Sequence, residues 1–270
     1  MSDVSEHHAT LGGEPVFWLQ ADGSGDVPVL YVHGVPTSAD DWRDFLALTG
    51  GLAPDLPGYG RSGKRGDGDY TLHRYGPWLE RFLQDRDIDR FCLVVHDWGS
   101  VGLMLAQAFP ERVERLVIMN AVPLLPGHRW HRLARVWRRR PLGELLMGAV
   151  NPITVRQLTR KANATPGPMP DAWVRRVVDQ LDQGTQRAIL RLHRSADPDV
   201  LAAAGARLGT LSCPTLVVWG EQDPYLPASL AGAYAAAIPG AQQLRLADAG
   251  HWPWLDRPDL VETVAAFLRG

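Results

Sequence analysis

The sequence predicts an α/β fold in which a mostly parallel β-sheet carries helices on both faces. Short apolar runs alternate with amphipathic stretches through the first half of the 270-residue chain and again after residue 213. Strands buried on both faces read as continuous apolar runs, because helices cover both sides of a parallel sheet. Between residues 123 and 208 this alternation stops and no strand pattern occurs. We therefore expect one sheet domain, residues 1–122 and 209–270, interrupted after the strand that ends near Asn120 by a helical cap, residues 123–208.

Each expected strand is a short apolar run, and each expected helix is an amphipathic stretch between two runs. The strands are expected at residues 29–32, 52–56, 91–96, 113–119, 214–220 and 242–246, and the helices at residues 40–48, 72–84, 101–109, 228–237 and 258–268. Cys92 and Cys213 stand in or beside strands, so we expect buried free thiols. The terminal segment with His7 and His8 lacks a pattern, and we expect a frayed end rather than a metal site.

Composition argues against several classes of protein. The formal net charge of −2 gives no overall electrostatic footprint for nucleic acid or for an anionic membrane. The basic stretch at residues 128–140 is interpreted as a solvated helix face. The sequence has no apolar leader and no apolar run long enough to span a bilayer, so we expect a cytoplasmic protein without a membrane partner. No metal or organic cofactor is implied, and a homodimer is an open alternative to a monomer.

The most informative stretch is HDWGS at residues 96–100, where an apolar run ends and a helical pattern begins at once. A nucleophile at such a turn is held on a strained corner, beside the free N–H groups of the helix N-terminus. The register puts Asp97 at the nucleophile position, although Val95 replaces the first glycine of the usual pattern. Ser100 would make a serine hydrolase, but it lies three residues past the corner. An N-cap role is the structural alternative for Asp97.

An aspartyl ester must be hydrolysed again, and that step needs a general base that activates water. His251 lies in a short loop before the last expected helix, and Asp223 follows the expected strand at residues 214–220. The chain order nucleophile, acid, histidine is the order found with a nucleophile elbow. Each signal is weak alone, but three such residues at three strand ends predict a triad of Asp97, His251 and Asp223. Glu221 is the competing acid.

Two further loops follow expected strands. The first continues into His33-Gly34-Val35, and the backbone N–H groups of Val35 and Trp98 could stabilise an oxyanion during ester hydrolysis. An ordinary turn is the alternative there. Residues 58–63, GYGRSG, match the dinucleotide fingerprint GxGxxG, but no helix pattern opens after them. We therefore expect a structural loop at residues 58–63.

These motifs resemble the α/β-hydrolase superfamily from about residue 14 to the end of the chain, and within it the branch of epoxide hydrolases and haloalkane dehalogenases. The motifs are HGVPTS at residues 33–38, DLPGYGRS at 55–62, HDWGS at 96–100, GEQDP at 220–224 and GHWPW at 250–254. The resemblance implies that Asp97 attacks a substrate carbon and forms an alkyl ester. It further implies that His251, oriented by Asp223, activates the water that hydrolyses this ester. The implied reactants are a small apolar epoxide or haloalkane and water.

The two activities differ in what the leaving group needs. A halide needs N–H donors, whereas an epoxide oxygen needs a proton. The resemblance implies that Trp98 would contact a halide. Many dehalogenases add an asparagine where this chain has Val35. The remaining candidates for a second donor are the cap tryptophans Trp130, Trp137 and Trp173.

Epoxide hydrolases of this branch typically protonate the oxygen with two cap tyrosines, and the expected cap contains no tyrosine. His131 and His193 lie near the two positions where those tyrosines are expected. We therefore predict hydrolysis of an epoxide to a vicinal diol, with these histidines as proton donors; surface histidines among arginines are the alternative. Haloalkane dehalogenation is the second hypothesis, and esterase action through Ser100 is the third. A non-catalytic binding protein is the alternative from a different class.

Overall fold

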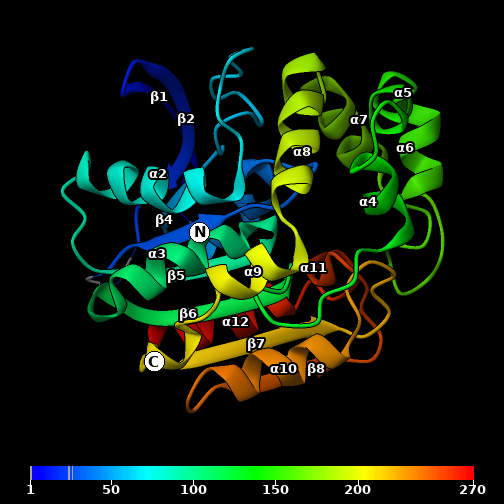
Figure 1. The fold of residues 1–270 in the computed structure, drawn as a ribbon. Coiled ribbons are helices and arrows are strands. Elements are labelled where there is room, and N and C mark those ends of the chain that lie inside the picture. Colours follow the sequence, from blue (N-terminus) through cyan, green and yellow to red (C-terminus); the bar gives the residue numbers. More distant parts are fainter. Residues whose placement is uncertain (1, 24, 26) are drawn as a thin grey trace.

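The computed structural model describes residues 2–23, 25 and 27–270. In this part of the chain one sheet has the strand order β1-β2-β4-β3-β5-β6-β7-β8 (Figure 1). Strands β3 to β8 run parallel to one another, whereas β1 and β2 form an antiparallel extension at one edge. The predicted mostly parallel sheet with helices on both faces is confirmed.

The strands agree with the expected apolar runs to within a few residues, and two strands were not expected. The strands are β1 (Ser5–Leu11), β2 (Glu14–Ala21), β3 (Val29–Val32), β4 (Gly51–Pro54), β5 (Phe91–Asp97), β6 (Val113–Ala121), β7 (Thr215–Gly220) and β8 (Gln242–Leu246). The helices around the sheet are α1 (Arg43–Thr49), α2 (Leu72–Gln84), α3 (Gly102–Ala108), α9 (Pro198–Ala204), α10 (Ser229–Ala237), α11 (Pro253–Asp256) and α12 (Leu260–Arg269). The helices above it are α4 (Arg132–Trp137), α5 (Leu142–Gly148), α6 (Pro152–Leu158), α7 (Asp171–Gln180) and α8 (Gln183–Ser195).

The expectation of a frayed N-terminus is wrong for residues 5–11, which form β1. This strand pairs with β2 along its whole length, so its backbone groups are satisfied by a ladder. His7 stacks on Trp18 with 5.1 Å between ring centroids, and His8 packs edge-on against Phe17 at 4.9 Å. This segment is therefore ordered by its pairing with β2, which follows after two intervening residues, and not by an apolar run of its own.

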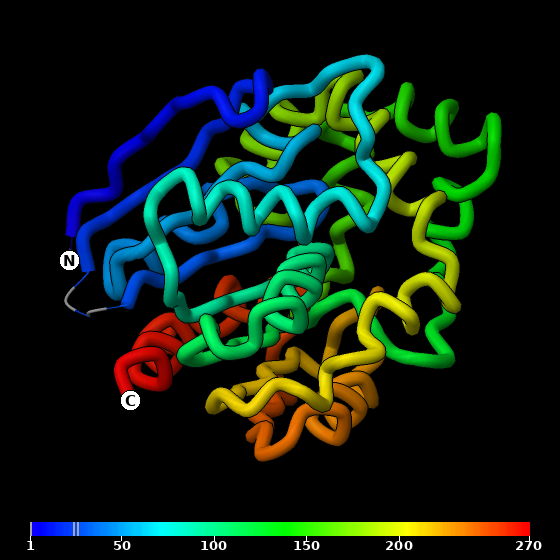
Figure 2. Tube along the Cα trace, turned by 60° about the vertical axis from the view of Figure 1, so that its left-hand side comes forward, coloured from blue at the N-terminus to red at the C-terminus, as the bar shows by residue number. Residues whose placement is uncertain are grey.

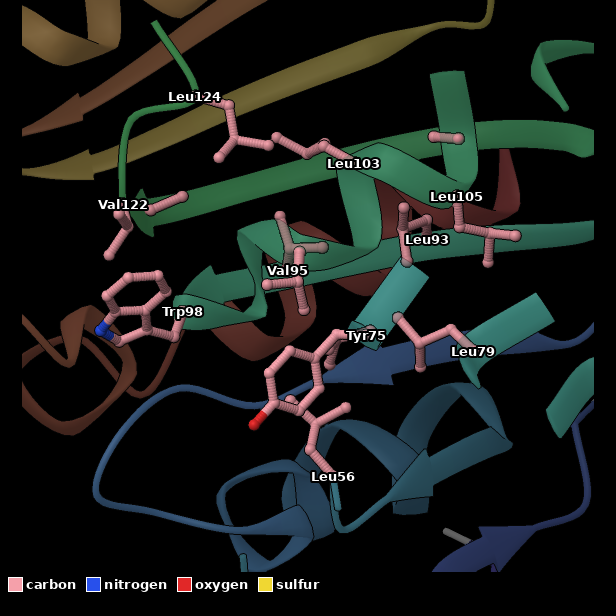
Figure 3. Close-up of a cluster of buried hydrophobic side chains, with 14 of the residues drawn as sticks. Leu56, Tyr75, Leu79, Leu93, Val95, Trp98, Leu103, Leu105, Val122 and Leu124 are labelled. Carbon is pink, nitrogen blue, oxygen red and sulfur yellow. The ribbon is translucent and has the colours of Figure 1, made fainter. Parts of the chain in front are cut away.

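Alternating side chains of β5 supply both faces of the sheet. Leu93 and Val95 join the cluster formed with α2 and α3 (Figure 3), whereas Cys92 and Val94 join the cluster on the opposite face, with α1 and α12. This two-sided burial explains why the strand reads as one apolar run. Cys92 and Cys213 are both buried free thiols. None of the described helices is long and apolar enough to cross a membrane.

The cap begins after β6, and it covers the end of the sheet remote from both chain termini (Figure 2). Helix α9, which was expected in the cap, lies on the sheet face beside α3 (Figure 1). There the Gln107 side chain donates to the carbonyl of Ala204 at 3.0 Å and accepts from the N–H of Arg207 at 2.9 Å. We therefore place the end of the cap near residue 197 rather than at 208.

Candidate active site

Asp97 lies at the corner between β5 and the helical turn that follows it. Its φ of 49° and ψ of −121° fall in a region that non-glycine residues rarely adopt. The turn packs closely against β3, because a Cβ on Gly99 would lie only 2.0 Å from the carbonyl oxygen of Val32. The chain thus makes the sharp strand-to-helix turn that the sequence predicted, and the Asp97 side chain lies at its tip.

The two oxygens of the Asp97 carboxylate have different surroundings. Oδ1 accepts a hydrogen bond from the backbone N–H of Val35 at 2.9 Å, and the N–H of Trp98 also faces the carboxylate. Oδ2 lies 3.7 Å from Nε2 of His251. Gly34 permits this approach, since a Cβ there would lie 2.5 Å from the Cβ of Asp97. One oxygen is therefore held by the N–H of Val35, while the other faces the imidazole.

Asp223 orients His251 from the opposite side of the ring. Nδ1 of His251 donates to Oδ2 of Asp223 at 2.7 Å, so Nε2 is the nitrogen left to accept a proton. The same carboxylate oxygen accepts from the side-chain amide of Asn120 at 2.8 Å. Its other oxygen accepts from the N–H groups of Tyr225 and Leu226 at 2.7 and 3.1 Å. Asp223 is therefore fixed in one orientation by four donors.

The electrostatics of the buried site favour charge on the imidazole. Burial alone would lower the pKa of His251, but the carboxylates of Asp223 and Asp97 outweigh it and raise the pKa above 6.5. Burial raises the pKa of Asp97, and the nearby His251 partly offsets this. The His251 loop is anchored from below, because Nε2 of His96 donates to the backbone carbonyl of His251 at 2.7 Å.

A cavity lies between the strand ends and the cap, and Asp97 and His251 both line it. Its empty volume is about 880 Å³, which includes space that is open to solvent. Its wall is mainly aliphatic and aromatic, with Val122, Leu146, Met147, Val155, Leu181 and Ile189 among the lining residues. The site can therefore hold a small apolar molecule against the carboxylate.

The contacts of His193 correct its expected role as a proton donor. Its Nδ1 donates to the carbonyl of Ile189 at 2.8 Å, and its Nε2 accepts from the indole N–H of Trp98 at 3.2 Å. Burial lowers the pKa of His193 to about 3, so the ring is neutral near pH 7. Both nitrogens are occupied and no proton is available. The same contact turns the Trp98 N–H away from any leaving group.

His131 has a different environment. Its Nδ1 caps α4 by accepting from the N–H of Ala134 at 3.4 Å, so the neutral ring carries its proton on Nε2. The ring lines the cavity and lies 5.3 Å from the ring of Tyr225. Burial lowers the pKa of His131 to about 4. His131 can therefore present a neutral N–H donor, and not the imidazolium that was expected.

The cap tryptophans divide between cavity and core. Trp130 stacks on Trp98 with 5.6 Å between ring centroids, lines the cavity, and has a buried indole N–H without a hydrogen-bond partner. Trp137 lines the cavity beside His193. Trp173 packs against Trp252 in the core cluster of the other sheet face and does not line the cavity. The indole N–H groups of Trp130 and Trp173 are both buried without a hydrogen-bond partner, and of these two side chains only that of Trp130 lines the cavity.

The alternative catalytic residues lie away from the cavity. The Ser100 side chain is fully buried and does not line the cavity, and Glu221 forms a salt bridge with Arg245. Neither side chain contacts His251.

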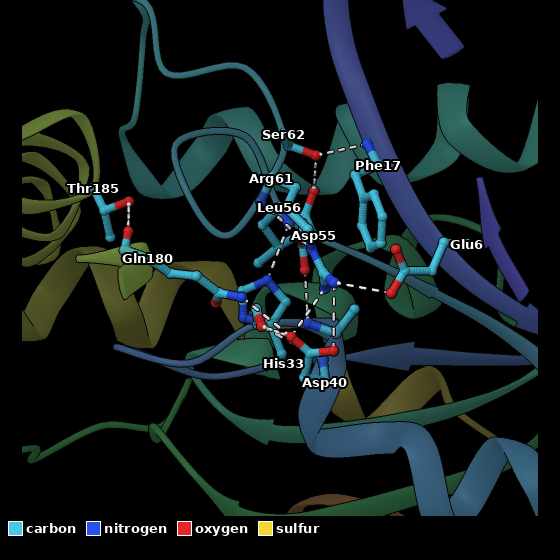
Figure 4. A network of polar contacts seen from close by, with 12 residues as sticks. Glu6, Phe17, His33, Asp40, Asp55, Leu56, Arg61, Ser62, Gln180 and Thr185 are labelled. Carbon is cyan, nitrogen blue, oxygen red and sulfur yellow. Dashed lines mark hydrogen bonds and ion pairs between the residues drawn. The ribbon is translucent and has the colours of Figure 1, made fainter. Parts of the chain in front are cut away.

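The loop with the GxGxxG match is structural, as expected. Asp55 at its start accepts from the N–H groups of Ala39 and Arg61, both at 2.7 Å (Figure 4). Nε2 of His33 accepts from the N–H of Leu56 at 3.0 Å. These contacts tie this loop to the loop that carries Val35, and they hold that N–H in place.

One residue of the site, Asn120, was not assigned a role from sequence. Asn120 ends the strand between the nucleophile strand and the acid strand, and its amide bridges Gly220 and Asp223. A polar residue at the end of an otherwise apolar strand beside the elbow was the available signal. Trp130 was one of three cap tryptophans named as candidate donors, but the sequence could not select it, because its neighbours come from distant segments.

Fold and elbow together define an α/β hydrolase. The model of the family described as "alpha/beta hydrolase fold" matches residues 27–258, and the chain belongs to this family. It is similar to haloalkane dehalogenase 1 of Mycobacterium tuberculosis, with 34% identity over 233 residues that cover 79% of this chain and 73% of that protein. The haloalkane dehalogenase of Mycolicibacterium paratuberculosis is 31% identical over 264 residues, which cover 89% of this chain and 83% of that protein.

Solved structures show the same fold over nearly the whole chain. Cfl2 from Burkholderia cenocepacia matches with a TM-score of 0.85 and 25% identity, covering 98% of this chain and 96% of that chain. The epoxide hydrolase CorEH matches with a TM-score of 0.85 and 19% identity, covering 98% of both chains, which is a likeness of fold alone. The protein is thus a hydrolase of the branch that contains haloalkane dehalogenases and epoxide hydrolases.

Proposed function

We propose that the protein opens a small apolar substrate through a covalent ester on Asp97. The observation that carries this proposal is the asymmetry of the Asp97 carboxylate. Oδ1 is held by the N–H of Val35 at 2.9 Å, while Oδ2 lies 3.7 Å from Nε2 of His251 and borders the cavity. A carboxylate that only capped a helix would not need an oriented imidazole beside its other oxygen.

The proposed reaction has two steps. Oδ2 of Asp97 attacks a substrate carbon, and the leaving group departs with the bonding electrons. Water then attacks the carboxyl carbon of the ester while Nε2 of His251 takes its proton. The negative charge develops on Oδ1, where the N–H groups of Val35 and Trp98 stabilise it. The intermediate collapses, the leaving oxygen takes the proton from His251, the alcohol product departs with the original Oδ2, and the oxygen from water stays on Asp97.

An epoxide is the substrate class that we infer for this site. A halide would need the indole N–H of Trp98, and that group donates to His193 at 3.2 Å. His131 lines the cavity, and its neutral tautomer carries a proton on Nε2. A neutral imidazole can polarise and protonate a developing oxyanion, as it does in triosephosphate isomerase. The donor side of the cavity therefore suits an oxygen leaving group.

A haloalkane is the second candidate. It is favoured by the names of the similar curated proteins and by the unused N–H of Trp130 in the cavity wall. A departing halide accepts hydrogen bonds but takes up no proton, so this single donor would suit it. Halide release from bromoalkanes distinguishes this activity from formation of a diol.

Single-turnover reactions in ¹⁸O-water test the ester mechanism. With excess enzyme and a small epoxide, ¹⁸O should appear in the peptide that contains Asp97 and not in the first product. In the His251→Gln variant the ester should accumulate, and mass spectrometry should find that peptide heavier by one substrate. The Asp97→Asn variant is the matched control and should carry no adduct. Direct transfer of ¹⁸O to the first product would exclude the ester.

Substitution of the two cap histidines tests the substrate class. His131→Phe should lower the rate of epoxide turnover at least about a hundredfold, the lower end of the usual range for loss of a positioned acid or base. Ester formation from a bromoalkane should persist in this variant, because a halide takes up no proton. Unchanged epoxide turnover in both His131→Phe and His193→Phe would contradict the assignment of an epoxide with a cap histidine as donor.

A further inference from the structure

The outer part of the cap has a strong excess of positive charge. Residues 129–161 contain nine arginines and lysines and one acidic residue, a formal charge of +8. The remainder of the chain carries −10, so the net charge of −2 is the sum of two strongly opposed regions. The overall charge led to the expectation of no anionic-membrane partner, and it conceals this asymmetry. A local basic surface attracts anionic partners whatever the net charge of the chain.

The same region exposes apolar side chains. Within the described residues, the large hydrophobic side chains that stay exposed all lie on α5 and α6. They are Leu142 (47% exposed), Leu145 (66%), Ile153 (67%) and Leu158 (38%). Both helices lie at the outer edge of the cap (Figure 1). Exposed apolar side chains gathered in one place and rimmed by charge mark an interaction surface. We call α5, α6 and residues 139–161 around them the basic apolar edge.

Most of the positive charge at this edge is not neutralised within the protein. Arg156 pairs with Asp171 at 2.8 Å, and Glu144 is neutralised by Arg194 at 2.7 Å. Four other basic residues are exposed and form no ion pair with the described residues: Arg139, Arg140, Arg160 and Lys161. Free cations beside exposed leucine and isoleucine are the combination that interfacial helices present to anionic lipid.

We propose that the basic apolar edge docks on an anionic lipid bilayer. Leu145 and Ile153 would enter the boundary between headgroups and acyl chains, and the free cations would lie among the headgroups. A symmetric contact with a second copy is disfavoured, because a two-fold axis would set this positive surface against itself. A bilayer supplies negative charge and apolar volume together, which this edge matches.

Docking at this edge would bring lipid close to the active-site cavity. Leu146, Met147 and Val155 lie on the same two helices and line the cavity. Apolar substrates concentrate in lipid, so a docked cap would receive them from the bilayer. This delivery rests on the proposed function, whereas the docking itself does not. A binding assay without substrate therefore tests docking independently of the chemistry.

Flotation of the full-length protein with lipid vesicles tests the proposal. The vesicles are phosphatidylcholine alone and an equal mixture of phosphatidylcholine and phosphatidylglycerol, at low and at high ionic strength. The protein should float with the mixed vesicles only, and added salt should release it. Leu145→Ser together with Ile153→Ser should weaken binding about tenfold for each side chain. Arg139→Gln together with Lys161→Gln should weaken it about fivefold for each charge.

The matched control replaces two exposed arginines of the sheet domain in the double variant Arg81→Gln with Arg269→Gln. Flotation of this variant should be unchanged. Unaltered thermal unfolding of each variant would show that the cap is intact. Three results would overturn the proposal. They are no flotation at low salt, an equal loss in the core control, and self-association of the wild type that Leu145→Ser abolishes. The last result would assign the edge to a second copy.

Discussion

The hydrogen bond between Trp98 and His193 predicts an unusual dependence of stability on pH. His193 is 2% exposed and is enclosed by the rings of Trp98, Trp130 and Trp137 at centroid distances of 4.9, 5.6 and 4.9 Å. Its Nε2 accepts from Trp98, so a proton there would face another N–H. The substitution His193→Phe isolates the contribution of the imidazole, because it keeps an aromatic ring in the same space and removes the titratable group.

The magnitude follows from the two pKa values. Burial lowers the pKa of His193 to about 3 in the folded protein, against 6.5 for an unhindered histidine. The unfolded chain therefore binds more protons between these values, so the contribution of this group is intact above pH 6.5 and declines as the pH falls toward 3. Each pH unit below 6.5 costs about 1.4 kcal/mol, which gives about 2 kcal/mol at pH 5. The variant loses two hydrogen bonds, the one to Ile189 and the one from Trp98, which costs it about 2 kcal/mol at every pH.

These two effects predict that the order of stability reverses. The wild type should be more stable than His193→Phe at pH 7, the two proteins should be about equally stable near pH 5, and the variant should be more stable at pH 4. Urea unfolding followed by tryptophan fluorescence at pH 4, 5 and 7 measures the difference. Because both proteins share every other titrating group, the change in this difference reports His193. A difference that stays constant from pH 7 to pH 5 would refute the buried neutral histidine.

Three further predictions concern the catalytic groups. Trp130→Phe should lower kcat/KM about tenfold or more without altering the fold, because Trp130 lines the cavity and its buried indole N–H has no hydrogen-bond partner; unchanged kinetics would exclude a contact with the leaving group. Asn120→Ala should destabilise the protein by about 1–3 kcal/mol in urea unfolding and lower kcat, because Asp223 loses a donor at 2.8 Å; equal stability would mean that the amide contributes nothing. Hydrolysis of the ester should speed up as the pH rises through a pKa above 6.5, because His251 must be neutral to take a proton and its pKa is raised; a transition below 6.5 would contradict the raised pKa.

The sheet and the arrangement of the triad residues could be predicted because both follow from short stretches of sequence. Where an apolar run is followed by a helical pattern within two residues, only a sharp turn can join the strand to the helix. Asp97 lies at that turn. Parallel strands end at the same edge, so Asp223 and His251 were expected nearby. Strand β1 was missed because its order depends on pairing with β2 and not on its own composition. Sequence patterns therefore located the residues whose position is set by a strand end.

The cap histidines show what such patterns cannot supply. His131 and His193 both lie on the cap and both have a lowered pKa, yet one caps a helix at the cavity wall and the other accepts from Trp98. These partners come from segments far apart in the chain, so spacing along the sequence does not encode them. Charge is a similar case, because the net charge of −2 for the whole chain concealed a charge of +8 on residues 129–161 of the cap.

The leaving-group side of the cavity decides between the two proposed substrates. The proposed nucleophile, base and acid can serve an epoxide and a haloalkane equally, because each substrate would give an ester on Asp97: a hydroxyalkyl ester from the epoxide and an alkyl ester from the haloalkane. What differs is the donor that meets the departing atom, and the Trp98 indole would suit a halide if its N–H were free. His193 takes that N–H at 3.2 Å and is itself held by Ile189, so the indole cannot turn to the cavity without losing a buried hydrogen bond. We therefore propose that His193, through its hydrogen bond to the neighbour of Asp97, shifts the site from halide toward oxygen leaving groups.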